Sequence, residues 1–206
     1  MANDPGRRRH YRMRRRAELV DKTRLRITEA AMQLHTTVGP SAASLSGIAE
    51  RAGVTRVTLY RHFADADALF AACMGHWRGL HPPPDAGTWR AVSDFEARVR
   101  LALGELYAWY DENASDLYPI YRDAAHTPAS NREARRANIE RMTDAIIAGV
   151  TVSAAERRRL RAAVRHVVGF WTWRSLSVDG QLSRREAVDL SFAFVLAART
   201  GVVRRS

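Results

Sequence analysis

The stretch from Leu45 to Phe63 constrains the fold most, because two short helical patterns meet there at a single glycine. Apolar Ile48 and small Ala49 precede Gly53, and the apolar pattern resumes after it. Small residues let two crossing helices approach closely, and glycine accepts a turn conformation that strains any residue with a Cβ. The spacing therefore predicts a helix-turn-helix corner with Gly53 in its turn.

The helix after this turn is predicted to present polar and basic side chains to solvent. With Leu59 inward, Arg56 and Tyr60 share the outer face, beside Val57 and Arg61. A helix of about eight residues, roughly 12 Å long, suits a major groove about 12 Å wide. Arg56 and Val57 are the candidate base contacts, because arginine can pair with guanine and valine can touch a thymine methyl. The side chains suited to phosphate are Ser44, Thr55, Thr58, Tyr60, Arg61 and His62. The alternative is a helical corner with no DNA partner.

A basic arm precedes this corner. Residues 1–26 carry ten basic and three acidic side chains, and so contribute +7 of the formal charge of +11. Residues 1–20 show no hydrophobic periodicity and contain Pro5 and Gly6, so we expect a disordered arm. Such charge predicts a polyanionic partner, either DNA or an anionic membrane, and the alternative is a solvated tail. The arm lacks the apolar face of a membrane anchor, which favours contact with the minor groove or with phosphates.

Further helical patterns surround the corner and predict one DNA-binding domain over 21–80. The first pattern ends at the stop signal Gly39-Pro40, and Asp65 is the expected N-cap of a later helix. The proline run at 82–84 is the clearest linker in the chain.

The region 88–206 is predicted to form a helical bundle. Four Ser-x-x-Glu capping boxes precede helical patterns, at Ser93/Glu96, Ser130/Glu133, Ser153/Glu156 and Ser183/Glu186. The expected helices cover 94–112, 131–149, 154–178 and 184–199, with a shorter one around 116–125. No segment shows the convincing alternation of apolar and polar residues that is typical of a β-strand. We therefore predict an all-α protein of about nine helices, in which a three-helix module with the helix-turn-helix is followed by the bundle.

The sequence IAERAGVTRVTLYRHF at 48–63 resembles the DNA-binding signature of the TetR family of transcriptional regulators. The flanking segments 28–31 and 67–70 extend the similarity, which covers about 22–79. This resemblance implies a cytoplasmic, ligand-responsive regulator, usually a repressor, that binds a palindromic operator in double-stranded DNA as a homodimer.

Two positions depart from the family pattern. Ala66 stands where the family usually has a lysine that touches phosphate. Gly47 stands at an often acidic position, which weakens its helix and removes a capping-box partner for Ser44. We expect the basic arm to supply the missing phosphate contact.

A dimer is also expected because one small module with one or two base-reading side chains binds too weakly to select a unique genomic site. The last two predicted helices carry apolar stripes suited to a two-fold interface, namely Leu160, Val164, Val167, Val168 and Trp171, and Ala187, Leu190, Phe194, Ala197 and Ala198. The alternative is that these stripes only close the core of one chain.

Most aromatic residues lie in the C-terminal region, where the family resemblance implies a pocket for a small-molecule effector. The candidate lining residues are Tyr107, Tyr110, Tyr121, His166 and Phe170. Glu105 and Asp111 would suit a cationic ligand there, or they are exposed charges. For each aromatic residue the alternative is core packing, because helical spacing does not separate a pocket wall from a core.

Other protein classes receive no support from motifs. There is no phosphate-binding glycine loop, no His-x-x-x-His spacing and no nucleophile elbow, so we expect no enzyme, no metal site and no cofactor. Cys73 is the only cysteine, which excludes an internal disulfide, and its apolar spacing predicts a buried thiol rather than a redox sensor. Without a membrane-spanning run or a signal-peptide core, we expect no membrane partner.

Overall fold

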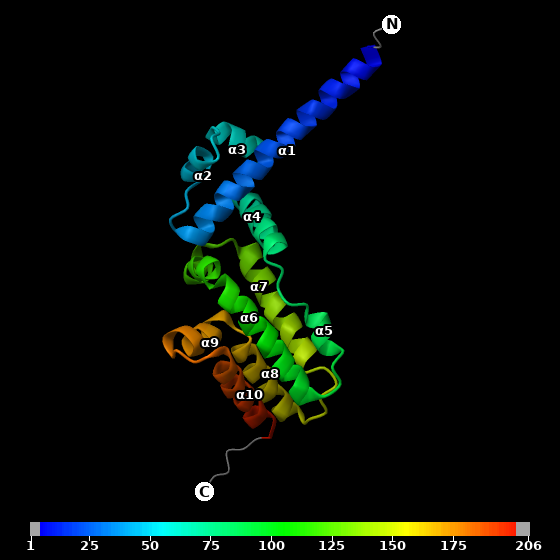
Figure 1. Ribbon diagram of the computed structural model, residues 1–206, viewed down its shortest axis with the longest axis vertical. Helices are drawn as coiled ribbons and strands as arrows, with labels where there is room; N and C mark the ends of the chain where they lie inside the picture. The colour runs from blue at the N-terminus through cyan, green and yellow to red at the C-terminus, as the bar shows by residue number, and fades with distance from the viewer. Residues whose placement is uncertain (1–4, 201–206) are drawn as a thin grey trace. The chain divides into compact units, whose positions relative to one another are not determined.

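A computed structural model of the chain describes the backbone of residues 5–200 and the side chains of residues 10–199 (Figure 1). This part of the chain contains ten α-helices, one 3-10 turn and one π turn, and no strand. The predicted all-α class, with an N-terminal helix-turn-helix and a C-terminal helical region, is confirmed.

The chain divides into two compact units. Unit 1 comprises the residues up to His81 together with Tyr118–Pro128, and unit 2 comprises Pro82–Leu117 and the residues from Ala129 onward. The predicted C-terminal domain, 88–206, therefore differs from unit 2, because the segment 118–128 folds with unit 1.

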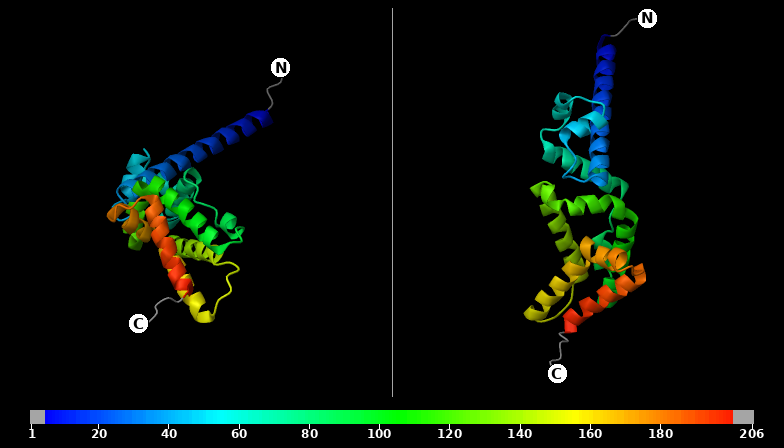
Figure 2. Two further views of the ribbon diagram at one scale, coloured as in Figure 1. Left: turned by 60° about the horizontal axis from the view of Figure 1, so that its bottom comes forward. Right: turned by 90° about the vertical axis from the view of Figure 1, so that its left-hand side faces the viewer.

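Unit 1 is built from α1, α2, α3 and α4, which cover Pro5–Thr37, Leu45–Arg51, Arg56–His62 and Ala66–Leu80. Helix α1 packs against α2 and α4, and α2 packs against α3 (Figure 2). Asp65 is the N-cap of α4 as expected, and Ser44 and Thr55 cap α2 and α3 in the same way. Each side-chain oxygen accepts a backbone N–H in the first turn, at 3.0 Å for Ser44, 3.1 Å for Thr55 and 2.7 Å for Asp65. Gly53 has φ +64°, the left-handed turn conformation that its spacing predicts.

Helix α1 corrects the expectation of a disordered arm over 1–20, since the chain is helical from Pro5. Arginine is a good helix former, and Pro5 stands at the first helical position, where its missing N–H costs nothing. Arg14 and Glu18 add an ion pair at 3.3 Å, one helical turn apart. Every side chain from residue 10 to 20 is exposed, so local helix propensity rather than packing forms this segment. Residues 1–4 lie outside the described residues.

Unit 2 contains α5, most of α6, and then α7, α8, α9 and α10. Their bounds are Ala86–Arg90, Phe95–Arg122, Ala129–Ile146, Ala154–Val167, Phe170–Arg174 and Arg184–Thr200, with a π turn at Ser175–Asp179. Helix α8 packs extensively against α10, and α7 lies beside both α5 and α8. A 3-10 turn at Ala124–His126 belongs to unit 1.

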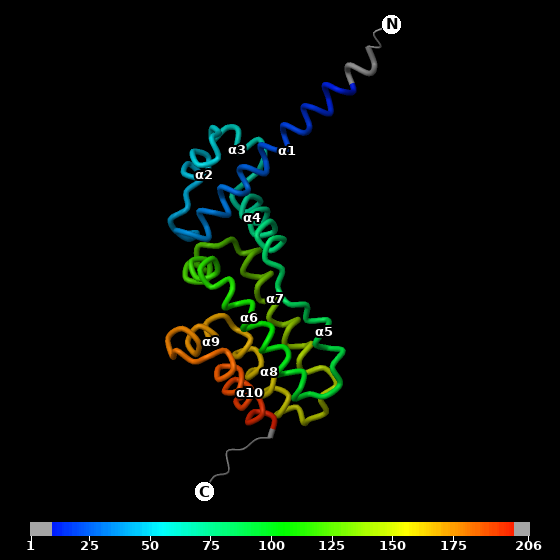
Figure 3. The backbone as a smooth tube through the Cα atoms, in the orientation of Figure 1, coloured from blue at the N-terminus to red at the C-terminus, as the bar shows by residue number. Residues whose placement is uncertain are grey.

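Two helix boundaries were predicted wrongly. Helix α6 (green in Figure 3) is assigned as one helix over Phe95–Arg122, where two were expected, over 94–112 and 116–125. It continues through Pro119, whose carbonyl accepts the N–H of Asp123 at 3.0 Å. The helix expected over 154–178 is instead interrupted at Gly169, which is the N-cap of α9.

Two of the four predicted capping boxes form. Ser153 with Glu156 and Ser183 with Glu186 exchange the expected hydrogen bonds. The other two predictions are wrong: Asp94, not Ser93, accepts the N–H of Ala97 at 2.7 Å, and Ser130 lies inside α7. An aspartate next to a serine competes for the same capping position, and the spacing alone does not choose between them.

Candidate nucleic-acid interface

The outer face of α3 is the candidate interface. Leu59 is 1% exposed and fixes the inner side of the helix, whereas Val57 is 72% exposed and Tyr60 is 45% exposed. Arg56 and Arg61 are also exposed. A valine with nearly three quarters of its surface in water contributes little to folding, so it is available for an apolar contact with a partner.

The polar residues predicted to contact phosphate surround this face. Ser44 and Thr55 are exposed, and their oxygens cap α2 and α3. The Thr55 hydroxyl lies 3.0 Å from that of Thr58, which is half-buried, as is His62. A hydroxyl oxygen that accepts a backbone N–H as an N-cap still carries a proton that it can donate. These residues can therefore also donate a hydrogen bond to a phosphate.

Helix α1 holds the two short helices in place. The Arg24 guanidinium lies over the Phe63 ring at 4.2 Å and donates to the His62 carbonyl. Arg51 Nε donates to Gln33 Oε1 at 2.8 Å and so joins α2 to α1. Sequence reasoning counted Arg24 only as one charge of the basic arm, because no local pattern links it to a residue 38 positions later.

Behind the interface, Cys73 and His35 form a buried pair. The Cys73 thiol donates to the Phe70 carbonyl at 3.1 Å and lies 3.3 Å from His35 Nδ1. Burial raises the pKa of Cys73 to about 12 and lowers the pKa of His35 to about 4. The predicted buried thiol is confirmed, and both groups are neutral at neutral pH.

The aromatic residues predicted to line an effector pocket are mostly core residues of unit 2. The Tyr107 hydroxyl donates to the Val167 carbonyl at 2.9 Å and lies 2.9 Å from Ser191 Oγ. The Tyr110 hydroxyl donates to the Val168 carbonyl at 2.9 Å, and its ring meets the buried Phe170 ring edge-on at 5.5 Å. These hydroxyls bind carbonyls at the end of α8, so burial and hydrogen bonding give the tyrosines a structural role.

The other two candidates lie elsewhere. His166 is exposed on α8, with its ring 5.7 Å from that of Phe194, and Tyr121 is half-buried in unit 1. The carboxylates suggested for a cationic ligand are also engaged within unit 2. Glu105 accepts the indole N–H of Trp89 at 2.6 Å, and Asp111 accepts from Trp173 and Arg184 at 2.8 and 2.6 Å. None of the five predicted residues lines the cleft that lies between α6 and α10.

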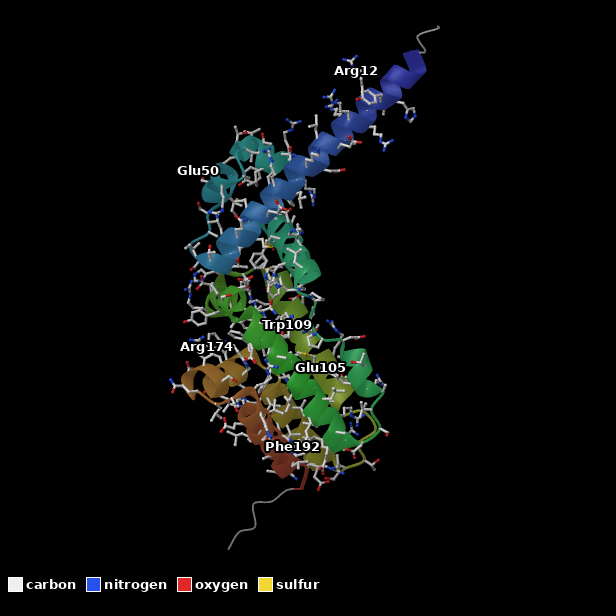
Figure 4. The ribbon with its side chains drawn as sticks, viewed as in Figure 1. Arg12, Glu50, Glu105, Trp109, Arg174 and Phe192 are labelled. Atoms are coloured by element: carbon white, nitrogen blue, oxygen red, sulfur yellow. The ribbon has the colours of Figure 1, made fainter. Side chains whose placement is uncertain are left out.

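An open cleft lies between α6 and α10 in unit 2, with a volume of about 1180 Å³. Phe192 (labelled in Figure 4) and Leu196 supply apolar surface, and Gly104 keeps the α6 side open, with no atom within 4 Å of an added Cβ. Arg100 stacks on the Phe192 ring at 3.7 Å and pairs with Asp189 at 2.5 Å. Sequence reasoning missed this cleft, because helical periodicity does not show where two helices separate.

The apolar stripes of α8 and α10 divide between core and surface. Leu190 and Phe194 are 52% and 51% exposed on α10, and Trp171 is 49% exposed on α9. Five residues of the predicted interface are instead buried inside unit 2, namely Leu160, Val164, Val167, Val168 and Ala187. For these five the interface prediction is wrong, and they close the core of the chain.

Within the described residues, no group of three His, Cys, Asp or Glu side chains could hold a metal ion. No described helix is both long enough and apolar enough to cross a membrane.

Residues 27–73 match the family model of bacterial regulatory proteins, tetR family. Over this segment the chain is similar to the N-terminal domain of the TetR family. No curated protein matches the chain. Solved structures resemble it over nearly their whole length. A TetR-like transcriptional regulator from Rhodococcus sp. RHA1 is 18% identical, over 87% of this chain and 96% of that chain, with a TM-score of 0.55.

Two further structures of transcriptional regulators are similar to this chain. A putative TetR-family regulator from Mesorhizobium loti MAFF303099 is 19% identical, over 88% of this chain and 97% of that chain, with a TM-score of 0.57. The regulator FadR from Bacillus subtilis, solved in complex with stearoyl-CoA, is 16% identical, over 86% of this chain and 98% of that chain, with a TM-score of 0.53. These likenesses show that the fold is that of TetR-family transcriptional regulators.

Proposed function

We propose that this TetR-like chain is a ligand-responsive transcriptional repressor that binds a palindromic operator in double-stranded DNA as a homodimer. The outer face of α3 carries this proposal: it exposes Arg56, Val57 and Tyr60 on a capped helix short enough to enter a major groove. Arg56 and Val57 read base edges, and the polar residues around them bind phosphate.

The basic arm extends this interface as a helix. An α-helix is about 10–12 Å wide and a minor groove only about 6 Å, so the helical arm follows phosphates instead of entering the minor groove. Arg12, Arg15 and Arg16 are exposed on it (Arg12 is labelled in Figure 4).

Deletion of residues 2–16 tests the role of the arm, because it removes seven arginines. Each phosphate contact that the deletion removes is expected to reduce the slope of log affinity against log salt by about 0.9. An unchanged slope would show that the arm is a solvated tail.

The exposed apolar residues of α9 and α10 support the homodimer. Leu190 and Phe194 share one face of α10, and His166 of α8 lies against Phe194. A second copy would bury this face across a two-fold axis. Sedimentation at micromolar concentration should therefore give a dimer, and Phe194→Asp should give a monomer.

The cleft between α6 and α10 is the proposed effector site in place of the aromatic cluster. Its apolar Phe192 and Leu196 suit the apolar body of a small molecule. Arg185 lies 3.9 Å from Asp189 in a long, exposed ion pair, and its guanidinium could bind an anionic group of the same molecule. The stearoyl-CoA complex of the similar FadR structure supports this ligand class. We propose a cytoplasmic location and no enzymatic activity.

Selection of bound fragments from random double-stranded DNA, with the full chain, tests the proposal. We expect enrichment of one palindromic sequence whose half-sites lie about one or two helical turns apart. The Arg56→Ala variant should fail to enrich it, whereas Arg136→Ala, which alters an exposed arginine of α7, should behave as the native chain. Binding to anionic vesicles without enrichment of any sequence would overturn the proposal in favour of a membrane surface.

A further inference from the structure

The loop of residues 38–44 sets where α2 begins, and the end of α6 holds this loop. Asp123 Oδ2 accepts the backbone N–H of Ser41 at 3.1 Å and its hydroxyl at 2.5 Å. Arg122 Nη2 donates to the Val38 carbonyl at 2.8 Å, and Arg122 Nε donates to Asp123 Oδ1 at 2.8 Å. We call these four residues, Val38, Ser41, Arg122 and Asp123, the loop clamp; all of them belong to unit 1.

The clamp is closely fitted. Asp123 is only 7% exposed, and the hydrogen bonds from Arg122 and then Ser41 hold its pKa well below the ordinary value. Gly39 has φ +94°, and a Cβ at this position would overlap Asp123 Oδ2. A side chain at Gly39 would therefore push the carboxylate away from the loop.

Packing beneath the loop is incomplete. A cavity of about 240 Å³ is lined by Pro40 and Ala43 of the loop, Ile48 of α2, Phe70 of α4 and residues 125–128. The cavity removes packing contacts that would otherwise fix the loop from below. The position of the loop therefore depends on the hydrogen bonds of the loop clamp.

We infer that Asp123, supported by Arg122, is a positioning residue for operator binding. In this role Asp123 itself contacts neither a base nor a phosphate. It fixes the loop from which α2 starts, and α2 packs on the DNA-reading helix α3. The inference rests on the proposed function, because positioning matters only if α3 reads DNA.

The test compares Asp123→Ala with the native chain, using the operator selected from random DNA. We expect binding about tenfold weaker, because an aspartate that accepts two hydrogen bonds from the loop is removed. Removal of a negative charge should by itself strengthen DNA binding, so the expected weakening has the opposite sign to a general charge effect. The salt slope should stay unchanged because no phosphate contact is removed, and amide exchange at residues 38–43 should become faster.

Gly39→Ala provides a second variant that keeps every polar group of the clamp. Its Cβ would overlap Asp123 Oδ2 and Arg122 Nη2, and alanine is strained at φ +94°, so operator binding should weaken as it does in Asp123→Ala. Asp144→Asn is the matched control: it removes an exposed carboxylate paired with Arg161 in unit 2, and should leave operator affinity unchanged.

The outcomes are distinct. Equal operator affinity of the native chain and Asp123→Ala, measured well below both melting temperatures, would overturn the inference and leave a purely structural contact. Failure of the native chain to select any sequence would overturn the proposed function, and the inference with it.

Discussion

The outer face of α3 and the aromatic cluster of unit 2 both contain large side chains at helical spacing, but these side chains are exposed on α3 and buried in unit 2. On α3, Val57 and Tyr60 project into solvent. In unit 2, Tyr107 and Phe170 are 0% and 1% exposed, and the Tyr107 hydroxyl is bound to protein groups. The first region leaves side chains available to a partner, whereas the second uses its polar groups to bind its own backbone.

This difference separates a binding surface from a core. A side chain that is exposed and free of a folding role can bind a partner without any cost of rearrangement. A hydroxyl that already donates to a buried carbonyl must first break that bond, which costs about 1–3 kcal/mol if the carbonyl stays unpaired. We therefore propose that α3 serves recognition and the aromatic cluster serves stability, and the substitutions below test this division.

Phe170→Ala should give the largest effect. The ring is buried between Tyr110 and Trp173, with ring centroids at 5.5 and 5.3 Å, so its removal leaves a cavity. We expect the free energy of unfolding to fall by about 3–5 kcal/mol, measured by urea denaturation. Under native conditions the operator affinity of the folded fraction should be unchanged. Weaker effector binding at unchanged stability would instead make the cluster a pocket and break the comparison.

Arg56→Ala should show the reverse pattern. Loss of a bidentate pair with guanine costs about 1–3 kcal/mol at each half-site, so operator affinity should fall by roughly one to two orders of magnitude per half-site. The melting temperature should stay the same because Arg56 is exposed. Fluorescence anisotropy with operator and with unrelated DNA measures the effect. A similar decrease on both DNAs would make Arg56 a phosphate contact.

The same contrast exists within unit 1, between the exposed face and the buried His35 behind it. His35 stays neutral in the folded state down to a pKa of about 4, whereas in the unfolded chain it binds a proton below about pH 6.5. The unfolded state therefore binds more protons as the pH falls, and the contribution to stability should drop by about 1 kcal/mol between pH 7 and 5.5.

His35→Phe tests this contribution because it keeps a ring beside Phe70, at present 4.8 Å away, and removes the ionisation. The unfolding free energy of this variant should depend less on pH over that range. The exposed His10 is the matched control, and His10→Phe should leave the native pH dependence intact. Identical pH dependence of His35→Phe and the native chain would mean that His35 is accessible to protons.

The sequence predicts those features of the fold that depend on neighbouring residues. The period of an α-helix was enough to turn Leu59 inward and Val57 outward, and the need for a left-handed turn identified Gly53. Competing local rules gave errors: the missing hydrophobic periodicity was weighed above the helix propensity of arginine in α1, and Ser93 was chosen above Asp94 as a cap.

Contacts between distant residues could not be predicted. Asp123 and Ser41 are 82 positions apart, and Tyr107 meets Val167 across 60 positions. No periodicity in one segment encodes which carbonyl in another will accept a hydrogen bond. For the same reason, spacing alone could not tell a core tyrosine from one that lines a pocket.

Val57→Ala should give the smallest effect and the sharpest test of the exposed face. The side chain is 72% exposed, so the substitution should leave the unfolding free energy nearly unchanged. If Val57 packs on a thymine methyl, operator affinity should fall by about 1 kcal/mol for each half-site, because alanine no longer reaches that methyl. Replacing that thymine by uracil, which lacks the methyl, should weaken the native chain by a similar factor and have no further effect on Val57→Ala. Additive effects of the two changes would show that Val57 and the methyl do not touch, and would leave Arg56 as the base contact of α3.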